Sequence, residues 1–299
     1  MHSTHQKILQ TLGADSSTFL GSGATSRVYD IGRGQVVRIF DHTNMAYLQD
    51  SADFYTELHR HAFPFALPDI EQMAHLDDCS YIVEKRLPGQ DMSLVFPTLD
   101  ATQRQHALRS FLEVLPHLHR VMLPERPFGE LLGWRQSITA VSWPQFLQQR
   151  TETNLRESLP FLREDMPNID QLVADLLRRL ETLTAVPKRL VHGDYCFANV
   201  MCDERGKITA VFDFSPLTLN GDPIMDLAGA LDFLTVYDFV TDAEQQFLRQ
   251  LIAAEYGSEA LEQIALYTTY YSLYFANGKD WQPEVYDWCL RQLRRYPFL

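Results

Sequence analysis

Three oxygen-bearing side chains that lie close together in the sequence have the types that phosphoryl transfer requires. Asp194 and Asn199 occupy a polar loop between apolar, strand-like segments, and Asp213 follows the second of these segments. This chemistry needs one carboxylate to orient and deprotonate the attacking hydroxyl, and an amide oxygen with a second carboxylate to hold Mg²⁺ against nucleotide phosphates. We therefore assign Asp194 as the catalytic base and Asn199 and Asp213 as metal ligands. Taken singly, Asp and Asn also serve simply as loop caps.

A glycine-bearing turn near the N-terminus is the candidate cover for the nucleotide phosphates. Gly21, Ser22, Gly23, Thr25 and Ser26 lie between two β-rich segments, where backbone N–H groups and hydroxyls would donate to phosphate oxygens. The turn lacks the Gly-Lys-Ser/Thr ending of a Walker loop, so it does not predict a nucleotide site at the start of a helix. By itself, a Gly-x-Gly between strands is more often an ordinary hairpin.

Arg38 is the candidate phosphate-binding cation. It lies in the β-rich segment 35–40, with Val37 and Ile39 on the other face of the strand because successive side chains alternate. Its guanidinium can bind phosphate oxygens in a bidentate manner, and Glu57, on the helix that follows, is its expected acidic partner. The alternative is an arginine that faces solvent from an edge strand.

The elements that position these residues divide the chain into a β-rich first third and a helical remainder. Strands are predicted over residues 18–20, 27–31, 35–40, 70–76 and 81–84, and a helix over 44–61. Further helices are predicted over residues 101–120, 146–161, 169–183, 226–236, 242–255, 261–275 and 283–294, with a short β interruption over 190–214. The Pro- and Gly-interrupted segment 123–143 has no assigned structure. We expect an α+β chain with an N-terminal lobe over 1–88, a linker near 86–99 and a helical lobe over 89–299.

The loop motif resembles that of a known family. His-Gly-Asp-x-x-x-x-Asn at 192–199, followed by Asp-Phe at 213–214, is similar to the catalytic and metal loops of the aminoglycoside phosphotransferases, which are related to eukaryotic protein kinases. Protein kinases carry Arg where this chain has Gly193, which favours the small-molecule branch. Residues 221–228 are similar to the Gly-Asp-Pro-x-x-Asp-Leu-Ala block of the same family.

The resemblance implies roles for residues outside the loop. Residues 81–89 are similar to the strand and hinge that contact adenine in the family, which implies nucleotide contacts for Glu84 and Arg86. Asp226 would brace the catalytic loop from below, a role compatible with capping the helix that follows it. We expect His192 to be structural, with its imidazole bonded to the backbone of the loop.

The resemblance also implies a fold and a reaction. The fold is a bilobal protein-kinase-like one, with a small antiparallel β N-lobe that carries one helix and a larger, mainly helical C-lobe. The reaction moves the γ-phosphoryl of ATP (or GTP), with Mg²⁺, to a hydroxyl of a small molecule: an aminoglycoside-like antibiotic, a metabolite alcohol such as a sugar, choline or homoserine, or a macrolide. A nucleotide-binding pseudokinase that acts as an interaction module stays open, because Arg38 replaces the usual Lys and Ser215 stands where protein kinases have Gly.

The charge of the chain bears on its partners. The formal net charge is −13, from 26 basic and 39 acidic residues, which argues against broad nucleic-acid binding and would attract a cationic small molecule. Thirteen of the acidic residues, against five basic ones, lie between Asp213 and the C-terminus. In the family the late helices wall the acceptor pocket, although solvated helix faces would also explain these charges. The aromatic residues among them are more often core than pocket lining; they are Tyr267, Tyr270, Tyr271, Tyr274 and Phe275.

Cysteine usage and hydropathy bear on the compartment. The four cysteines show no CxxC spacing, which favours reduced thiols in a cytoplasmic protein over a disulfide framework. The first residues lack the basic region and apolar run of a signal peptide, and no stretch is apolar enough for a membrane span. We therefore expect a cytoplasmic protein with no membrane partner, as a monomer or homodimer.

Overall fold

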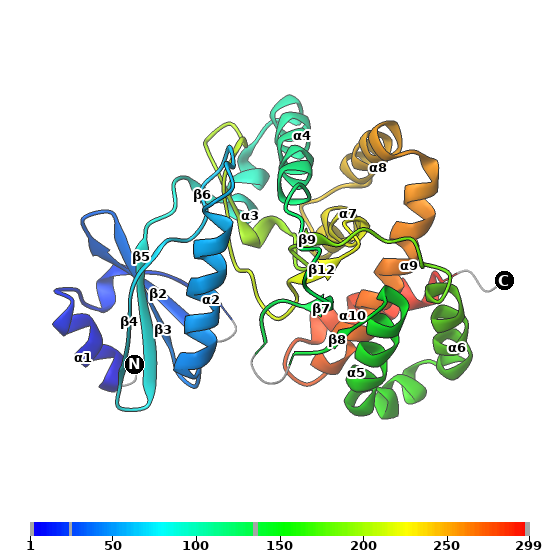
Figure 1. The fold of residues 1–299 in the computed structure, drawn as a ribbon. Coiled ribbons are helices and arrows are strands. Elements are labelled where there is room, and N and C mark those ends of the chain that lie inside the picture. Colours follow the sequence, from blue (N-terminus) through cyan, green and yellow to red (C-terminus); the bar gives the residue numbers. More distant parts are fainter. Residues whose placement is uncertain (1–2, 24–25, 134–136, 297–299) are drawn as a thin grey trace.

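A computed structural model describes residues 3–23, 26–133 and 137–296. Figure 1 shows an antiparallel sheet with two helices formed by the first third of the chain, and a mainly helical part formed by the rest. This arrangement confirms the predicted α+β class with a small antiparallel sheet followed by a larger helical region.

The N-terminal sheet has five strands in the order β1-β2-β3-β5-β4, and all neighbours are antiparallel. The strands are β1 (Phe19–Ser22), β2 (Ser26–Gly32), β3 (Gln35–Phe40), β4 (Ile70–Leu76) and β5 (Cys79–Lys85). The β2–β3 hairpin turns through Gly32, Arg33 and Gly34, all with positive φ. The five predicted strands are thus confirmed to within a few residues. Central strand β3 lies between β2 and β5, so Arg38 is not on an edge strand.

Helices cover both faces of this sheet. Val37 and Ile39 are fully buried on one face, against Ile8 and Leu9 of α1 (Ser3–Thr11). Helix α2 (Met45–Leu58) packs on the opposite face, as Figure 1 also shows. Only α2 was predicted from the sequence, so the first helix is an addition to the expected lobe. It closes a face that would otherwise expose the alternating apolar residues of β2, β3 and β5.

The helical part contains eight of the α-helices described. They are α3 (Met92–Val95), α4 (Ala101–Leu118), α5 (Trp143–Asp165), α6 (Ile169–Leu180), α7 (Ile224–Asp232), α8 (Asp242–Tyr256), α9 (Ser258–Phe275) and α10 (Pro283–Arg294). Their apolar faces form one core together with α2. The predicted helices are confirmed, and α5 is longer than expected. None of the helices among the described residues combines the length and apolarity needed to cross a bilayer.

Two small sheets interrupt the helices and carry the polar loops. One has the order β11-β10-β6 and the other β8-β7-β12-β9. Their strands are β6 (Gln90–Asp91), β7 (Phe128–Glu130), β8 (Thr139–Ala140), β9 (Arg189–Val191), β10 (Val200–Cys202), β11 (Ile208–Val211) and β12 (Leu219–Gly221). The predicted β interruption over 190–214 is therefore confirmed, and the unassigned segment 123–143 contributes β7 and β8.

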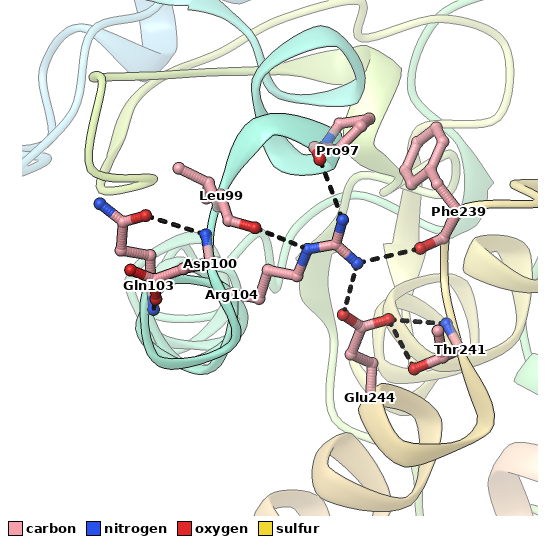
Figure 2. Close-up of polar contacts among 8 residues, drawn as sticks. All are labelled: Pro97, Leu99, Asp100, Gln103, Arg104, Phe239, Thr241 and Glu244. Atoms are coloured by element: carbon pink, nitrogen blue, oxygen red, sulfur yellow. Dashed lines mark hydrogen bonds and ion pairs between the residues drawn. The ribbon is translucent and has the colours of Figure 1, made fainter.

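Arg104 of α4 ties the start of the helical part to the segment before α8 (Figure 2). Its guanidinium donates to the carbonyls of Pro97 at 3.0 Å, Leu99 at 3.1 Å and Phe239 at 3.2 Å, and to Glu244 Oε1 at 2.9 Å. Hydrogen bonds to a charged donor are stronger than neutral ones. One side chain thus joins the turn before α4 to the segment before α8, which at Phe239 lies 135 residues further along the chain than Arg104.

Candidate active site

The loop between β9 and β10 carries Asp194 and Asn199, and a buried carboxylate fixes its backbone. Asp226, in the first turn of α7, accepts the backbone N–H of His192 at 2.9 Å and that of Gly193 at 2.8 Å. His119, at the end of α4, lies 3.0 Å from the same carboxylate. The predicted bracing role is confirmed. The prediction that Asp226 caps the helix is wrong, because Asp222 accepts the N–H of Ile224 at the start of α7.

The imidazole of His192 joins the two halves of the site. Its Nδ1 accepts the backbone N–H of Asp194 at 3.3 Å, so Nε2 carries the proton and donates to the carbonyl of Phe212 at 2.9 Å. These partners assign a neutral imidazole, fully buried and bonded only to backbone. The prediction that His192 is structural is therefore confirmed.

Asp194 and Asn199 contact each other directly. Asn199 Nδ2 donates to Asp194 Oδ2 at 3.0 Å and to the Asp194 carbonyl at 2.8 Å. The amide nitrogen of Asn199 therefore faces the carboxylate. The amide oxygen, Oδ1, is the acceptor atom of this side chain and the atom that would bind a cation. Burial raises the pKa of the Asp194 carboxyl above its usual range, and the negative charge of Asp213 adds to the effect.

Asp213 reaches the same site from the end of β11. The Phe212 N–H donates to the Asn199 carbonyl at 3.1 Å, which aligns the segment before Asp213 with the catalytic loop. Asp213 has φ 65°, a left-handed conformation that Asp tolerates better than most residues, and its side chain is 49% exposed. Phe214, next along the chain, packs against Phe54 and Tyr55 of α2, with ring centroids 5.6 and 5.9 Å apart. The turn at Asp213 thus points the carboxylate away from the core in which Phe214 is buried.

Arg38 connects the N-terminal sheet to this loop. It lies on the face of β3 opposite to Val37 and Ile39, as predicted, with Nη1 3.6 Å from Asp213 Oδ1. Its acidic partner is Glu84 of β5, with Nη2 3.3 Å from Oε1. Glu84 and Val36 are directly opposed in the register, so the carboxylate stands diagonally across from Arg38 on the same face.

The prediction that Glu57 pairs with Arg38 is wrong. Glu57 lies 2.5 Å from Nη2 of Arg126 instead. Two residues along a helix differ by about 200° in direction, so Tyr55 and Glu57 cannot face the same neighbour. Tyr55 is buried towards the Arg38 face, where the charge of Arg38 acts on its hydroxyl, and Glu57 is directed elsewhere.

Gly193 is required by the way the loop is stacked. Its φ is 82°, and a Cβ atom there would lie 1.8 Å from the carbonyl oxygen of Leu217. The Leu217 segment is itself held by Thr218, whose hydroxyl donates to the His192 carbonyl at 3.2 Å and accepts the Ser215 N–H at 3.0 Å. Ser215 therefore takes part in an ordinary hydroxyl-capped turn beside the catalytic loop.

The glycine-bearing turn and the hinge are less tightly held. Ser22 and Gly23 are exposed, and the Gly23 N–H donates to the Ser26 carbonyl at 3.0 Å. Thr25, named with them as a phosphate donor, lies outside the described residues. The guanidinium of Arg86 pairs with Asp30. Phosphate and nucleotide contacts of Gly21, Ser22, Gly23, Ser26, Glu84 and Arg86 stay predictions.

Two residues near the site were missed from the sequence. Tyr237, which follows α7, accepts the Ala198 N–H at 3.2 Å and stacks on Phe197 at 5.7 Å. Arg150 of α5 is fully buried, pairs with Glu130 and donates to the carbonyl of Pro216 at 3.0 Å. Neither has a local signal, because a tyrosine after a helix and an arginine within one are both common. Only the folded chain brings them to the loops.

The late aromatic residues belong mainly to the core. Tyr267, Tyr270 and Tyr271 of α9 are almost completely buried, and Tyr267 donates to Asp222 Oδ2 at 2.5 Å. Burial raises the pKa of all three phenols. They therefore stabilise the helices behind the site, which agrees with the prediction that these aromatic residues belong to the core.

Comparison with known proteins places the chain in a family. The model of the phosphotransferase enzyme family matches residues 16–267, which include every catalytic and metal-binding candidate named above. None of the curated proteins gives a significant match to the chain.

Solved structures with similar folds include complexes with nucleotides and aminoglycosides. A thermostable mutant of aminoglycoside phosphotransferase APH(4)-Ia, in ternary complex with AMP-PNP and hygromycin B, is similar at a TM-score of 0.74 and 20% identity, covering 98% of this chain and 97% of that one. The gentamicin complex of APH(2")-IIa gives 0.66 and 15%, covering 99% and 97%. APH(3'')-Id from Streptomyces rimosus, with ADP and streptomycin, gives 0.57 and 16%, covering 92% and 99%. At these identities the likeness establishes the fold.

Proposed function

The chain belongs to the phosphotransferase enzyme family, and on that premise we propose that it moves the γ-phosphoryl group of ATP or GTP to a hydroxyl of a small molecule. The observation that carries the proposal is the direct contact of Asp194 with Asn199, on a loop aligned by backbone bonds with the segment that ends at Asp213. These are the side chains that a base and two metal ligands require.

Asp194 would act as the base. Its carboxylate would accept the proton of the acceptor hydroxyl while that oxygen forms a bond to the γ-phosphorus and the bond from phosphorus to the β,γ-bridging oxygen breaks. The proton then passes to solvent and the nucleoside diphosphate leaves. Asn199 holds one carboxylate oxygen at 3.0 Å, and the other oxygen would accept the proton of the hydroxyl. Burial, by raising the pKa of Asp194, makes it a better proton acceptor.

Asn199 and Asp213 fit a magnesium ion. The Asn199 amide turns its nitrogen to Asp194, which leaves a neutral oxygen donor, and the Asp213 carboxylate is half exposed, with Arg38 opposed to it at 3.6 Å. Hard oxygen donors of this kind suit Mg²⁺, which also takes phosphate oxygens and water. When bound, the ion would neutralise charge on the phosphates.

Residues 1–88 would hold the nucleotide, and residues 89–299 would supply the base and the acceptor site. Glu84 fixes Arg38 from one side, so the guanidinium is oriented before a phosphate arrives. The turn over 21–26 would add backbone N–H groups to the phosphate oxygens, and the segment around Arg86 would lie beside the base. Positioning and charge neutralisation would then supply most of the acceleration.

For the acceptor we favour a polyhydroxylated, cationic small molecule such as an aminoglycoside. The net charge of −13 supports this class, as do the similar structures with hygromycin B, gentamicin and streptomycin. A metabolite alcohol or a macrolide would use the same machinery.

A transfer assay tests this proposal. The purified chain is incubated with Mg²⁺ and γ-labelled ATP or GTP, against a panel of aminoglycosides and a panel of metabolite alcohols and macrolides. We expect label on at least one acceptor, and labelling that is about 10²–10⁴-fold slower with Asp194→Asn. Asp287→Asn, the same change at an exposed position of α10, is the matched control and should keep full activity. Tight nucleotide binding with no labelled acceptor in either panel would favour an interaction module instead.

A further inference from the structure

A second group of metal-binding side-chain types lies on the face of the N-terminal sheet opposite to Arg38. His5 comes from α1, Asp41 directly follows β3, and Cys79 begins β5. One ligand atom from each of the three lies within 4.8 Å of the other two. Two of them are in the core, since His5 is 0% and Cys79 1% exposed.

Asp41 is the solvent-exposed member of this cluster. Asp41 Oδ1 lies 2.6 Å from His5 Nε2, and the side chain of Asp41 is 37% exposed. Its other oxygen, Oδ2, lies 3.0 Å from Nη1 of Arg27. Carboxylates that bind a metal through one oxygen are commonly held through the other by an outer hydrogen bond. Arg27 is placed to do this, which leaves Oδ1 facing His5 and Cys79.

We propose that His5, Asp41 and Cys79 bind one divalent transition-metal ion of the zinc type, with water as the fourth ligand on the exposed side. One imidazole, one carboxylate and one thiolate form a borderline-soft set that suits Zn²⁺ and not Mg²⁺ or Ca²⁺. Bond lengths of about 2.0–2.3 Å in a tetrahedron place donor atoms about 3.3–3.6 Å apart. In the structure, His5 Nε2 and Asp41 Oδ1 are 2.6 Å apart, and all three ligand atoms lie within 4.8 Å of one another. Shifts of about an ångström would bring these atoms to the tetrahedral spacing.

Binding would release the Cys79 proton to solvent as the thiolate bonds to the ion. Asp78 adds a second carboxylate beside the cluster, with Oδ1 3.7 Å from Cys79 Sγ. The negative charge of Asp41 and Asp78 favours a divalent cation at this position. The consequence would be structural, because the ion would fasten α1 to the ends of β3 and β5.

Cobalt binding tests the site without reference to catalysis. The full chain, stripped with a chelator, is titrated with Co²⁺, and the near-ultraviolet thiolate-to-cobalt charge-transfer band is recorded. We expect a band that saturates at one equivalent and is bleached by Zn²⁺. Cys79→Ser should abolish it, whereas Cys289→Ser, a matched change at a cysteine buried in α10, should leave it unchanged. No band in the wild-type chain, or a band that survives Cys79→Ser, would overturn the proposal.

Thermal unfolding with Zn²⁺ gives a second readout that does not depend on any variant folding well. An ion that binds only the folded state raises the melting temperature of the wild-type chain as its concentration rises. Asp41→Asn, which keeps the shape of the side chain, should weaken Zn²⁺ binding by about tenfold or more. A wild-type melting temperature that is unchanged by Zn²⁺ would contradict the site, whatever the variants do.

Discussion

The catalytic loop over 192–199 and the glycine-bearing turn over 21–26 are held in opposite ways. In the loop, the fully buried carboxylate of Asp226 accepts two backbone N–H groups, the imidazole of His192 accepts a third, and Gly193 has no room for a Cβ atom. In the turn, Ser22 and Gly23 are exposed, and a Cβ atom at Gly21 would meet nothing within 4 Å. The groups that would do chemistry are preorganised, whereas those that would cover phosphates are left open for the ligand.

The largest effect should come from the base. Asp194→Asn keeps the shape of the side chain and removes its ability to accept a proton, so kcat should fall by about 10²–10⁴-fold. Nucleotide affinity should be nearly unchanged, because Arg38 and the turn are untouched. Steady-state kinetics and nucleotide titrations check this, with Asp287→Asn as the control. Near wild-type turnover would remove Asp194 from the mechanism.

Arg38 is the link between the two regions, and its variants separate stability from binding. Arg38→Met leaves Glu84 buried without its partner, which should cost about 3–5 kcal/mol in the free energy of unfolding. Adding Glu84→Gln should recover most of that loss, whereas nucleotide affinity should stay about tenfold lower in both. Denaturant unfolding and nucleotide titration measure the two effects. If the double variant binds nucleotide as tightly as the wild-type chain, Arg38 has no phosphate role.

Replacing a glycine by alanine in the loop and in the turn tests how differently the two regions are packed. Gly193→Ala forces a positive φ on alanine and drives its Cβ into the Leu217 carbonyl, so the unfolding free energy should fall by about 2–4 kcal/mol. Melting temperature and urea midpoint report the loss. A fully stable Gly193→Ala protein would mean that the catalytic loop is not packed against the 215–218 segment as described.

Gly21→Ala should have the smallest effect on stability. The added methyl meets open space, so the change in unfolding free energy should stay below about 1 kcal/mol. The KM for nucleotide should rise if the backbone of the turn approaches phosphate closely, while kcat stays near wild type. Equal losses of stability in the two glycine variants would erase the distinction between loop and turn.

The sequence was informative where function depends on local spacing and poor where it depends on register or long-range packing. Asp194, Asn199 and Asp213 could be proposed from the sequence because their types and intervals match the roles of a base and two metal ligands, and the structure brings Asp194 and Asn199 into contact. Glu84 could not be identified as the partner of Arg38, because that contact depends on the pairing of β3 with β5. Helix α1 was missed because its first residues are polar, and only the apolar face of the sheet explains Ile8 and Leu9.

The most direct test of the central claim measures turnover that requires Asp194, the metal ligands and the nucleotide together. Mg²⁺-dependent hydrolysis of ATP or GTP, with water in place of the acceptor, needs no knowledge of the natural substrate. We expect slow turnover by the wild-type chain that stops when EDTA is added, and no turnover by Asp194→Asn or Asp213→Asn although both remain folded. Hydrolysis that persists unchanged in either variant, or without a divalent cation, would contradict the assignment.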